Sequence, residues 1–256
     1  MQEMAPYWVG TSWKMNHTLA EAKAYAETLV KHDGARDPRI QRFIVPPYTA
    51  VRQVKEILAG SSVLVGAQNM HWEEAGGWTG EISARLLKEC NVDFIEIGHS
   101  ERRAHFGETD ETVGFKVRTA IAYGFIPLIC IGETLDEREA GRADEVLRAQ
   151  LEGAFQFLGD QARSAGILVA YEPVWSIGER GIPATSDYVT EKHGKIKRWS
   201  SQLLPRTPPV LYGGSVNAEN CTGLFAREGV DGLFIGRAAW TPEGYLEILR
   251  RCAPVK

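Results

Sequence analysis

Short apolar runs alternate with amphipathic stretches along this 256-residue chain, and that alternation constrains the fold more than any other feature. In one amphipathic stretch the apolar face repeats at helical spacing through Leu147, Leu151, Ala154, Phe155 and Leu158. The apolar runs are rich in β-branched residues and predict strands at Tyr7–Ser12, Arg42–Val45, Val63–Ala67, Phe94–Ile97, Ile126–Ile131, Ile167–Tyr171, Val210–Tyr212 and Leu233–Ile235. Strict alternation of strand and helix predicts a parallel sheet with buried strands, because each crossover helix covers a face of the sheet.

Eight such units without a linker favour a closed α/β barrel, the (β/α)8 or TIM barrel, formed as a single domain by residues 1–256. The alternative is an open doubly wound sheet. That fold often carries Gly-x-Gly-x-x-Gly after its first strand. Here the first strand ends Val9-Gly10-Thr11-Ser12 and continues into Trp13-Lys14-Met15-Asn16, so the glycine motif is absent at that position.

Composition and charge exclude several classes of partner. Hydrophobic residues make up 44% of the chain and charged residues 24%, as in ordinary soluble proteins. A net charge of -4 leaves no basic excess for nucleic acid, whereas a small anionic substrate needs only a local positive potential. The chain shows no secretory signal, no apolar run long enough for a membrane helix and no cysteine pairing motif. We therefore expect a cytoplasmic protein without a nucleic-acid or membrane partner.

The residues able to do chemistry collect at the carboxyl ends of the predicted strands, where the catalytic residues of such barrels lie. They are Ser12, Lys14, Gln68, Asn69, His99, Glu101, Glu172, Ser215, Gly236 and Arg237. We therefore expect the mouth of the barrel to hold one cation, one imidazole, one carboxylate and two glycine-rich turns.

Taken alone, some of these residues have a simpler explanation. Lys14 is equally consistent with a solvated lysine at the barrel rim, and His99 with a cap for the helix that begins near Ser100. Glu172 is harder to explain in this way, because it ends a buried strand and a charge there costs free energy without a partner or a function. The glycine turns suit tight bends, but successive backbone amides before a helix also bind anions, and the last two loops of such barrels commonly hold phosphate.

Six blocks of sequence resemble the motifs of triosephosphate isomerases, in the family's order and over nearly the whole chain. They are Trp13-Lys14-Met15-Asn16, Gly66-Ala67-Gln68-Asn69, Gly98-His99-Ser100-Glu101-Arg102-Arg103, Cys130-Ile131-Gly132-Glu133-Thr134, Tyr171-Glu172-Pro173-Val174-Trp175 and Tyr212-Gly213-Gly214-Ser215-Val216. The resemblance implies a phosphosugar isomerase that moves a carbonyl by enediolate proton transfer. By position, Glu172 is then the base, His99 the neutral imidazole that polarises the carbonyl, and Lys14 the cation that stabilises the enediolate and the phosphate.

The same resemblance implies roles for the surroundings of this trio. Glu101 is expected to contact Lys14, and Pro173–Gly181 to form a lid that closes over the phosphate. The backbone amides expected to hold the phosphate belong to Gly178, Ser215, Gly236 and Arg237. No metal ion and no organic cofactor are implied, because hydrogen bonds polarise the carbonyl in this family.

The family's loop after the third strand reaches into a neighbouring subunit. Here that loop is Met70–Thr79, which contains two tryptophans. The resemblance therefore implies a homodimer or higher oligomer, in which Thr79 approaches the partner's site.

Three departures from the family pattern fall at the expected mouth. Ser12 replaces an asparagine, Gly178-Glu179-Arg180-Gly181 replaces a Gly-Thr-Gly-like hinge, and Gly236-Arg237 replaces a glycine pair. Neutral drift in a working triosephosphate isomerase is one explanation. Altered specificity is the other, and the location of the changes favours it, because the chemical residues are retained while the pocket differs.

These departures resemble the L-erythrulose-1-phosphate isomerases of bacterial erythritol catabolism. Their substrate is dihydroxyacetone phosphate with an added hydroxymethyl group on the carbon that loses its proton, and Ser12 offers space for that group. The expected product is D-erythrulose 4-phosphate. The alternative is the glycolytic interconversion of dihydroxyacetone phosphate and glyceraldehyde 3-phosphate. A barrel that binds phosphosugars without turning them over has no need of the base Glu172, which argues against a sensor or scaffold.

Overall fold

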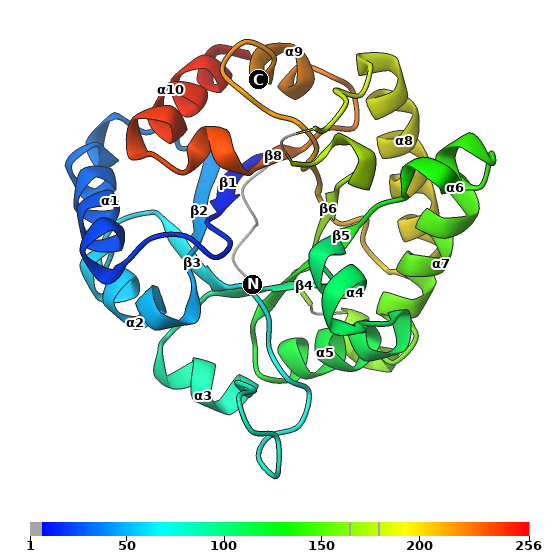
Figure 1. Cartoon of the computed structure of the whole chain (residues 1–256), viewed down its shortest axis with the longest axis horizontal. Helices are drawn as coiled ribbons and strands as arrows, with labels where there is room; N and C mark the ends of the chain where they lie inside the picture. The colour runs from blue at the N-terminus through cyan, green and yellow to red at the C-terminus, as the bar shows by residue number, and fades with distance from the viewer. Residues whose placement is uncertain (1–6, 164, 179, 256) are drawn as a thin grey trace.

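The computed structural model describes residues 7–163, 165–178 and 180–255. Eight parallel strands hydrogen-bond to their neighbours in chain order and close into a barrel, with β8 returning to β1. Figure 1 shows the strands at the centre and the helices around them. The expected (β/α)8 barrel is confirmed.

The strands are β1 Tyr7–Ser12, β2 Ile40–Val45, β3 Leu64–Ala67, β4 Phe94–Ile97, β5 Ile126–Ile131, β6 Leu168–Tyr171, β7 Val210–Tyr212 and β8 Gly232–Ile235. The helices are α1 Leu19–Lys31, α2 Tyr48–Ile57, α3 Ala84–Glu89, α4 Ser100–Phe106, α5 Asp110–Ala122, α6 Leu135–Glu139, α7 Ala143–Phe155, α8 Ser186–Leu203, α9 Cys221–Phe225 and α10 Pro242–Cys252. All eight strands were predicted, and their bounds differ from the prediction by two residues at most. The predicted helical face 147–158 was too long, since Leu158 lies beyond the end of α7, although it is buried.

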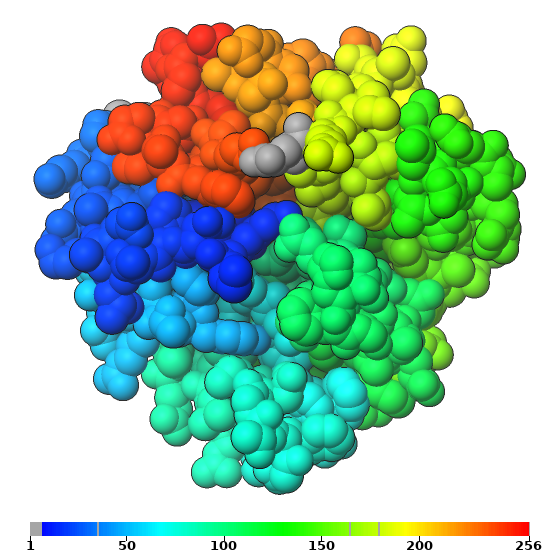
Figure 2. Space-filling model, in the orientation of Figure 1, coloured from blue at the N-terminus to red at the C-terminus, as the bar shows by residue number. Residues whose placement is uncertain are grey.

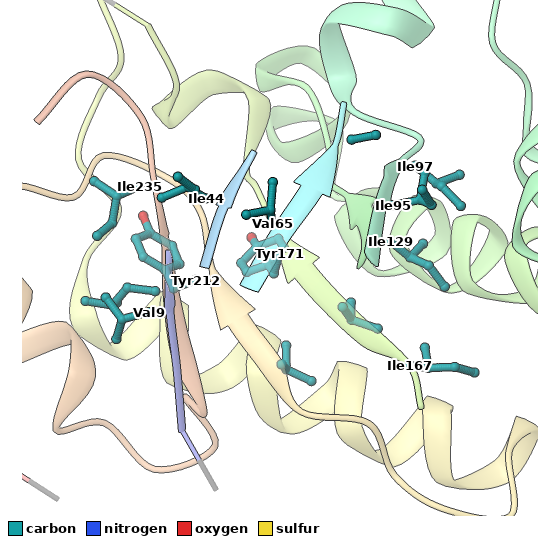
Figure 3. Close-up of a cluster of buried hydrophobic side chains, with 14 of the residues drawn as sticks. Val9, Ile44, Val65, Ile95, Ile97, Ile129, Ile167, Tyr171, Tyr212 and Ile235 are labelled. Carbon is teal, nitrogen blue, oxygen red and sulfur yellow. The ribbon is translucent and has the colours of Figure 1, made fainter. Parts of the chain in front are cut away.

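Alternate residues of each strand serve two separate cores. Outward-facing residues such as Val9, Ile95 and Ile129 pack against the helices in the larger cluster, part of which is shown in Figure 3. Inward-facing residues fill the barrel and form a second cluster: Trp8, Phe43, Val45, Phe94, Leu128, Cys130, Leu168, Ala170, Leu211 and Phe234. The barrel interior is thus a packed core and not a channel.

Two glycines make room for the largest rings inside the barrel. A Cβ atom at Gly10 would lie 2.3 Å from the ring of Phe43, and one at Gly66 would lie 2.5 Å from the ring of Phe94. The rings of Phe43 and Phe94 meet edge to face at 5.2 Å between centroids. These aromatic residues fill the barrel interior together with the aliphatic side chains of the second cluster.

Period-two alternation decides which residues face that mouth from within. Ser12 shares its face of β1 with Trp8, Glu96 shares its face of β4 with Phe94, and Glu172 continues the inward face of β6. The segments after β1, β4, β6 and β8 converge around the centre of the face shown in Figure 2. Within the described part of the chain, no helix combines the length and apolar character needed to cross a membrane.

Candidate active site

A cavity of about 260 Å³ opens at the carboxyl ends of the strands. Its lining includes all eight residues that the sequence predicted for catalysis and for substrate or phosphate binding: Ser12, Lys14, His99, Glu172, Gly178, Ser215, Gly236 and Arg237. Residues from five βα connections therefore meet at one place, as the strand-end pattern predicted.

Glu172 lies at the base of this cavity with 5% of its surface exposed. Its backbone N–H donates to Ile131 O at 2.8 Å, which continues the pairing of β6 with β5. Among the described residues its Oε2 atom has no hydrogen-bond partner and lies 3.6 Å from His99 Nε2. A buried carboxylate oxygen without a partner is costly in free energy, so this geometry is typical of a group that acts on a ligand.

Gly213 allows Glu172 to occupy that position. A Cβ atom at Gly213 would lie 2.6 Å from Glu172 Cγ and 3.0 Å from its Oε1. The glycine turn that the sequence suggested as an anion site thus also has a steric role, which sequence reasoning missed.

His99 caps α4, as the simpler explanation from the sequence held, and it also lines the cavity. Its Nδ1 atom accepts a hydrogen bond from the backbone N–H of Glu101 at 3.1 Å. A ring nitrogen that accepts carries no proton, and the neutral imidazole therefore has its proton on Nε2. That Nε2–H group is the one directed towards Glu172, where it can donate to a substrate oxygen.

Lys14 is held in place from both ends of the residue. Its backbone lies in the left-handed region, with φ at 51°, and its carbonyl accepts a hydrogen bond from Gln68 Nε2 at 2.8 Å. Its ammonium group donates to Glu101 Oε1 at 2.6 Å, which is the contact expected from the sequence. Strained backbone held by specific contacts is typical of functional sites.

Ser12 contacts a second buried carboxyl group that sequence reasoning missed. Its Oγ donates to Glu96 Oε2 at 2.9 Å, and Glu96 is only 3% exposed. Burial first, and then the nearby Glu172 charge, raise the pKa of Glu96 to about 7, against the opposing effects of His99, the Ser12 hydrogen bond and Lys14. The sequence signal for Glu96 is a single charge within the apolar strand Phe94–Ile97, which is not a strand-end position.

The opposite side of the cavity has room for an anion. A Cβ atom at Gly236 would meet no atom within 4 Å, and Arg237 lines the cavity beside it. Gly178 has φ at 86°, which favours glycine. The backbone amide of Ser215 donates a hydrogen bond to Ser176 Oγ at 3.1 Å. If this amide is to bind a phosphate, Ser176 must move away or the amide must donate to both groups.

The start of the expected lid is fixed by Glu133, another residue whose role the sequence did not reveal. Its buried carboxylate accepts hydrogen bonds from Tyr171 OH, Trp175 Nε1 and Tyr188 OH, the last two at 2.8 Å. Arg138 lies 4.1 Å from the centre of the Trp175 ring. Of the altered hinge, Arg180 is exposed and Glu179 lies outside the described residues.

Thr79 is exposed on the connection between β3 and α3, which extends away from the barrel in Figure 1. The side chains of this connection pack against one another. The centroid of the His71 ring lies 4.1 Å from that of Trp72, on which it stacks, and 4.3 Å from that of Trp78. Trp78 is nevertheless 48% exposed. Tryptophan is among the residues enriched in protein–protein interfaces, so the exposed ring of Trp78 is available for such a contact.

Comparisons with known proteins agree with this geometry. The family model described as triosephosphate isomerase matches residues 7–252. A protein of Brucella abortus (strain 2308) named L-erythrulose-1-phosphate isomerase is 60% identical over 250 residues, covering 98% of each chain. A protein of Rhizobium meliloti (strain 1021) with the same name is 61% identical over 246 residues, covering 96% of each chain.

Proposed function

We propose, from the premise that this chain belongs to the triosephosphate isomerase family, that it interconverts L-erythrulose 1-phosphate and D-erythrulose 4-phosphate. The family makes the chain an isomerase. The observation that supports a four-carbon substrate is the sequence identity to proteins named L-erythrulose-1-phosphate isomerase. That identity is 60% over 98% of both chains.

Glu172 is the proposed base. It removes the proton from C3 of the ketose, beside the C2 carbonyl, and the electron pair forms a C2–C3 double bond with the oxyanion at C2. The C3 hydroxyl then passes its proton to the C2 oxyanion, the same carboxyl group returns its proton to C2, and the carbonyl forms at C3. The buried, unpartnered Oε2 atom of Glu172 supports this role, because such an oxygen is free to accept a proton from carbon.

His99 and Lys14 are proposed to stabilise the charge that develops on the oxygens. The Nε2–H group of His99 donates to the C2 oxygen and, as the carbonyl moves, to the C3 oxygen. Lys14 places a positive charge at the same mouth, and Glu101 fixes its direction. Charge stabilisation by groups that are already in position lowers the barrier most, since nothing has to reorganise during the reaction.

The phosphate is proposed to bind on the side of the cavity formed by Gly178, Ser215, Gly236 and Arg237. The open space at Gly236 supports this placement. Because the Ser215 amide is engaged with Ser176, we expect the segment after Glu172 to rearrange when the phosphate binds. Closure of that segment would exclude water and protect the enediolate.

We also propose that two copies of the chain associate through the Met70–Thr79 connection, with Thr79 directed at the partner's site. The 48% exposure of Trp78 supports this association, because aromatic side chains are enriched in protein–protein interfaces. The free thiols of Cys90, Cys130, Cys221 and Cys252 support a reducing compartment such as the cytoplasm.

A comparison of kcat/KM on L-erythrulose 1-phosphate and dihydroxyacetone phosphate tests the proposal. We expect a higher value for the four-carbon ketose. A preference for the three-carbon ketose would overturn the proposed substrate and leave an ordinary triosephosphate isomerase. Turnover of neither sugar would overturn both assignments.

A further inference from the structure

Glu96 is an acid inside an otherwise apolar section of the barrel. Phe94 precedes it on the inward face of β4, and Leu128 pairs with it in register on β5. Burying a carboxyl group beside these apolar side chains costs free energy. The apolar packing of the barrel interior therefore does not itself require an acid at this position.

Among the described residues, the carboxyl group of Glu96 makes one hydrogen bond, to Ser12 at the cavity wall. Ser12 Oγ donates its proton to Glu96 Oε2 at 2.9 Å, and Ser12 lines the cavity while Glu96 lies behind it. The carbonyl of Ser12 accepts a hydrogen bond from Trp240 Nε1 at 3.0 Å, which fixes the end of β1. A hydroxyl group has one proton and two lone pairs, so Ser12 Oγ is left as an acceptor on its cavity side.

Resting on the proposed function, we propose that Ser12 and Glu96 form a pair that recognises the terminal hydroxyl group of the four-carbon sugar. Ser12 Oγ accepts the hydrogen bond from that hydroxyl, and Glu96 is a positioning residue that holds Ser12 as an acceptor. The added hydroxymethyl group is on the carbon deprotonated by Glu172, and Ser12 and Glu172 line the same cavity. The pair thus recognises the hydroxymethyl group, which is present in the four-carbon ketose and absent from the three-carbon ketose.

The test compares L-erythrulose 1-phosphate with its 4-deoxy analogue, 3-hydroxy-2-oxobutyl phosphate, which keeps the fourth carbon but lacks the hydroxyl group. The wild-type protein is expected to prefer the hydroxyl-bearing sugar by about fivefold in kcat/KM, the effect of one ordinary hydrogen bond to a neutral acceptor. Ser12→Ala and Glu96→Leu should each bring this ratio close to one. Glu96→Gln should keep most of it, because the amide oxygen still accepts the Ser12 proton.

A double variant tests whether Glu96 acts through Ser12. Ser12→Ala combined with Glu96→Leu should have the same ratio as either single variant, because the second change removes nothing further. Leu128→Val is the matched control, since it trims the barrel interior beside Glu96 without touching the pair, and it should slow both sugars alike. A general packing defect does not alter the ratio between two substrates.

The outcomes separate the two proposals. If the wild-type protein prefers dihydroxyacetone phosphate to the four-carbon ketose, the proposed function fails. If it prefers the four-carbon ketose but Ser12→Ala leaves the deoxy ratio unchanged, the recognition pair is overturned and the function stands. A Glu96→Leu protein that fails to fold leaves the Ser12→Ala result decisive, because that change removes a single oxygen at the cavity wall. Additive losses in the double variant would show that Glu96 does not act through Ser12.

Discussion

Replacing Glu96 with glutamine removes a charge from the barrel interior but keeps an oxygen that accepts the Ser12 hydrogen bond. The shape of the side chain is unchanged, so the substitution isolates the effect of ionisation on the free energy of unfolding. Because Glu96 is buried and faces the Glu172 charge, its pKa rises from 4.5 to about 7 on folding. The folded chain therefore disfavours the ionised form.

The sign and size of the effect follow from proton linkage. A raised pKa gives the folded state stability that is fully present below pH 4.5 and is lost as the pH rises through about 7. A tenfold change in a proton-binding constant is worth about 1.4 kcal/mol, so the raised pKa corresponds to about 3 kcal/mol. Glu96→Gln should then gain up to about 3 kcal/mol relative to wild type between acidic pH and pH 8.5.

Urea unfolding followed by tryptophan fluorescence at pH 5 and pH 8.5 measures this gain, at equal protein concentrations because association also shifts stability. Glu219→Gln, at an exposed position, controls for the loss of a surface charge. A difference between the Glu96→Gln and wild-type proteins that stays the same at both pH values would refute the reasoning. A gain at acidic pH instead would mean that partners stabilise the ionised form more than burial disfavours it.

Three further predictions concern the reaction itself. Glu172→Gln should lower kcat by at least about 100-fold with unchanged circular dichroism, since the carbon acid loses its base; retained turnover would remove Glu172 from the mechanism. Gly213→Ala places a Cβ atom 2.6 Å from Glu172 Cγ and should lower kcat by about tenfold or more, whereas Gly223→Ala, which meets no atom within 4 Å, should not. Equal rates for both alanine variants would contradict the steric role of Gly213. Ser12→Asn should lower kcat/KM for the four-carbon ketose more than for dihydroxyacetone phosphate, and an unchanged ratio would show that Ser12 does not provide the space.

The strands could be predicted because each is buried on both faces and reads as an apolar run. The errors fall where this signal is weak. Gly232 opens β8 one residue before the predicted start, because glycine has no side chain to indicate a strand, yet a Cβ atom there would lie 2.0 Å from Trp8 O. Leu158 continued the helical spacing of α7, but burial and not helical structure explains why it is apolar.

The site could be predicted as far as it consists of strand ends, because parallel strands of a closed barrel bring those ends together. Glu96 could not be predicted in this way, because it lies within a strand and contacts Ser12 only in the closed barrel. The contacts of Glu133 with Tyr171, Trp175 and Tyr188 were hidden for a related reason. They join residues up to 55 positions apart in the chain, and no local pattern records such a distance.

The left-handed backbone of Lys14 has a consequence for engineering this protein. Such a conformation costs a residue with a side chain about 1 to 2 kcal/mol, and glycine would relieve that cost. A library screened only for heat resistance should therefore enrich glycine at position 14, and with it lose the ammonium group that Glu101 orients. Selection for thermal stability thus favours glycine at position 14, whereas selection for turnover favours lysine. Residue 14 should therefore be kept as lysine when the protein is engineered for thermal stability.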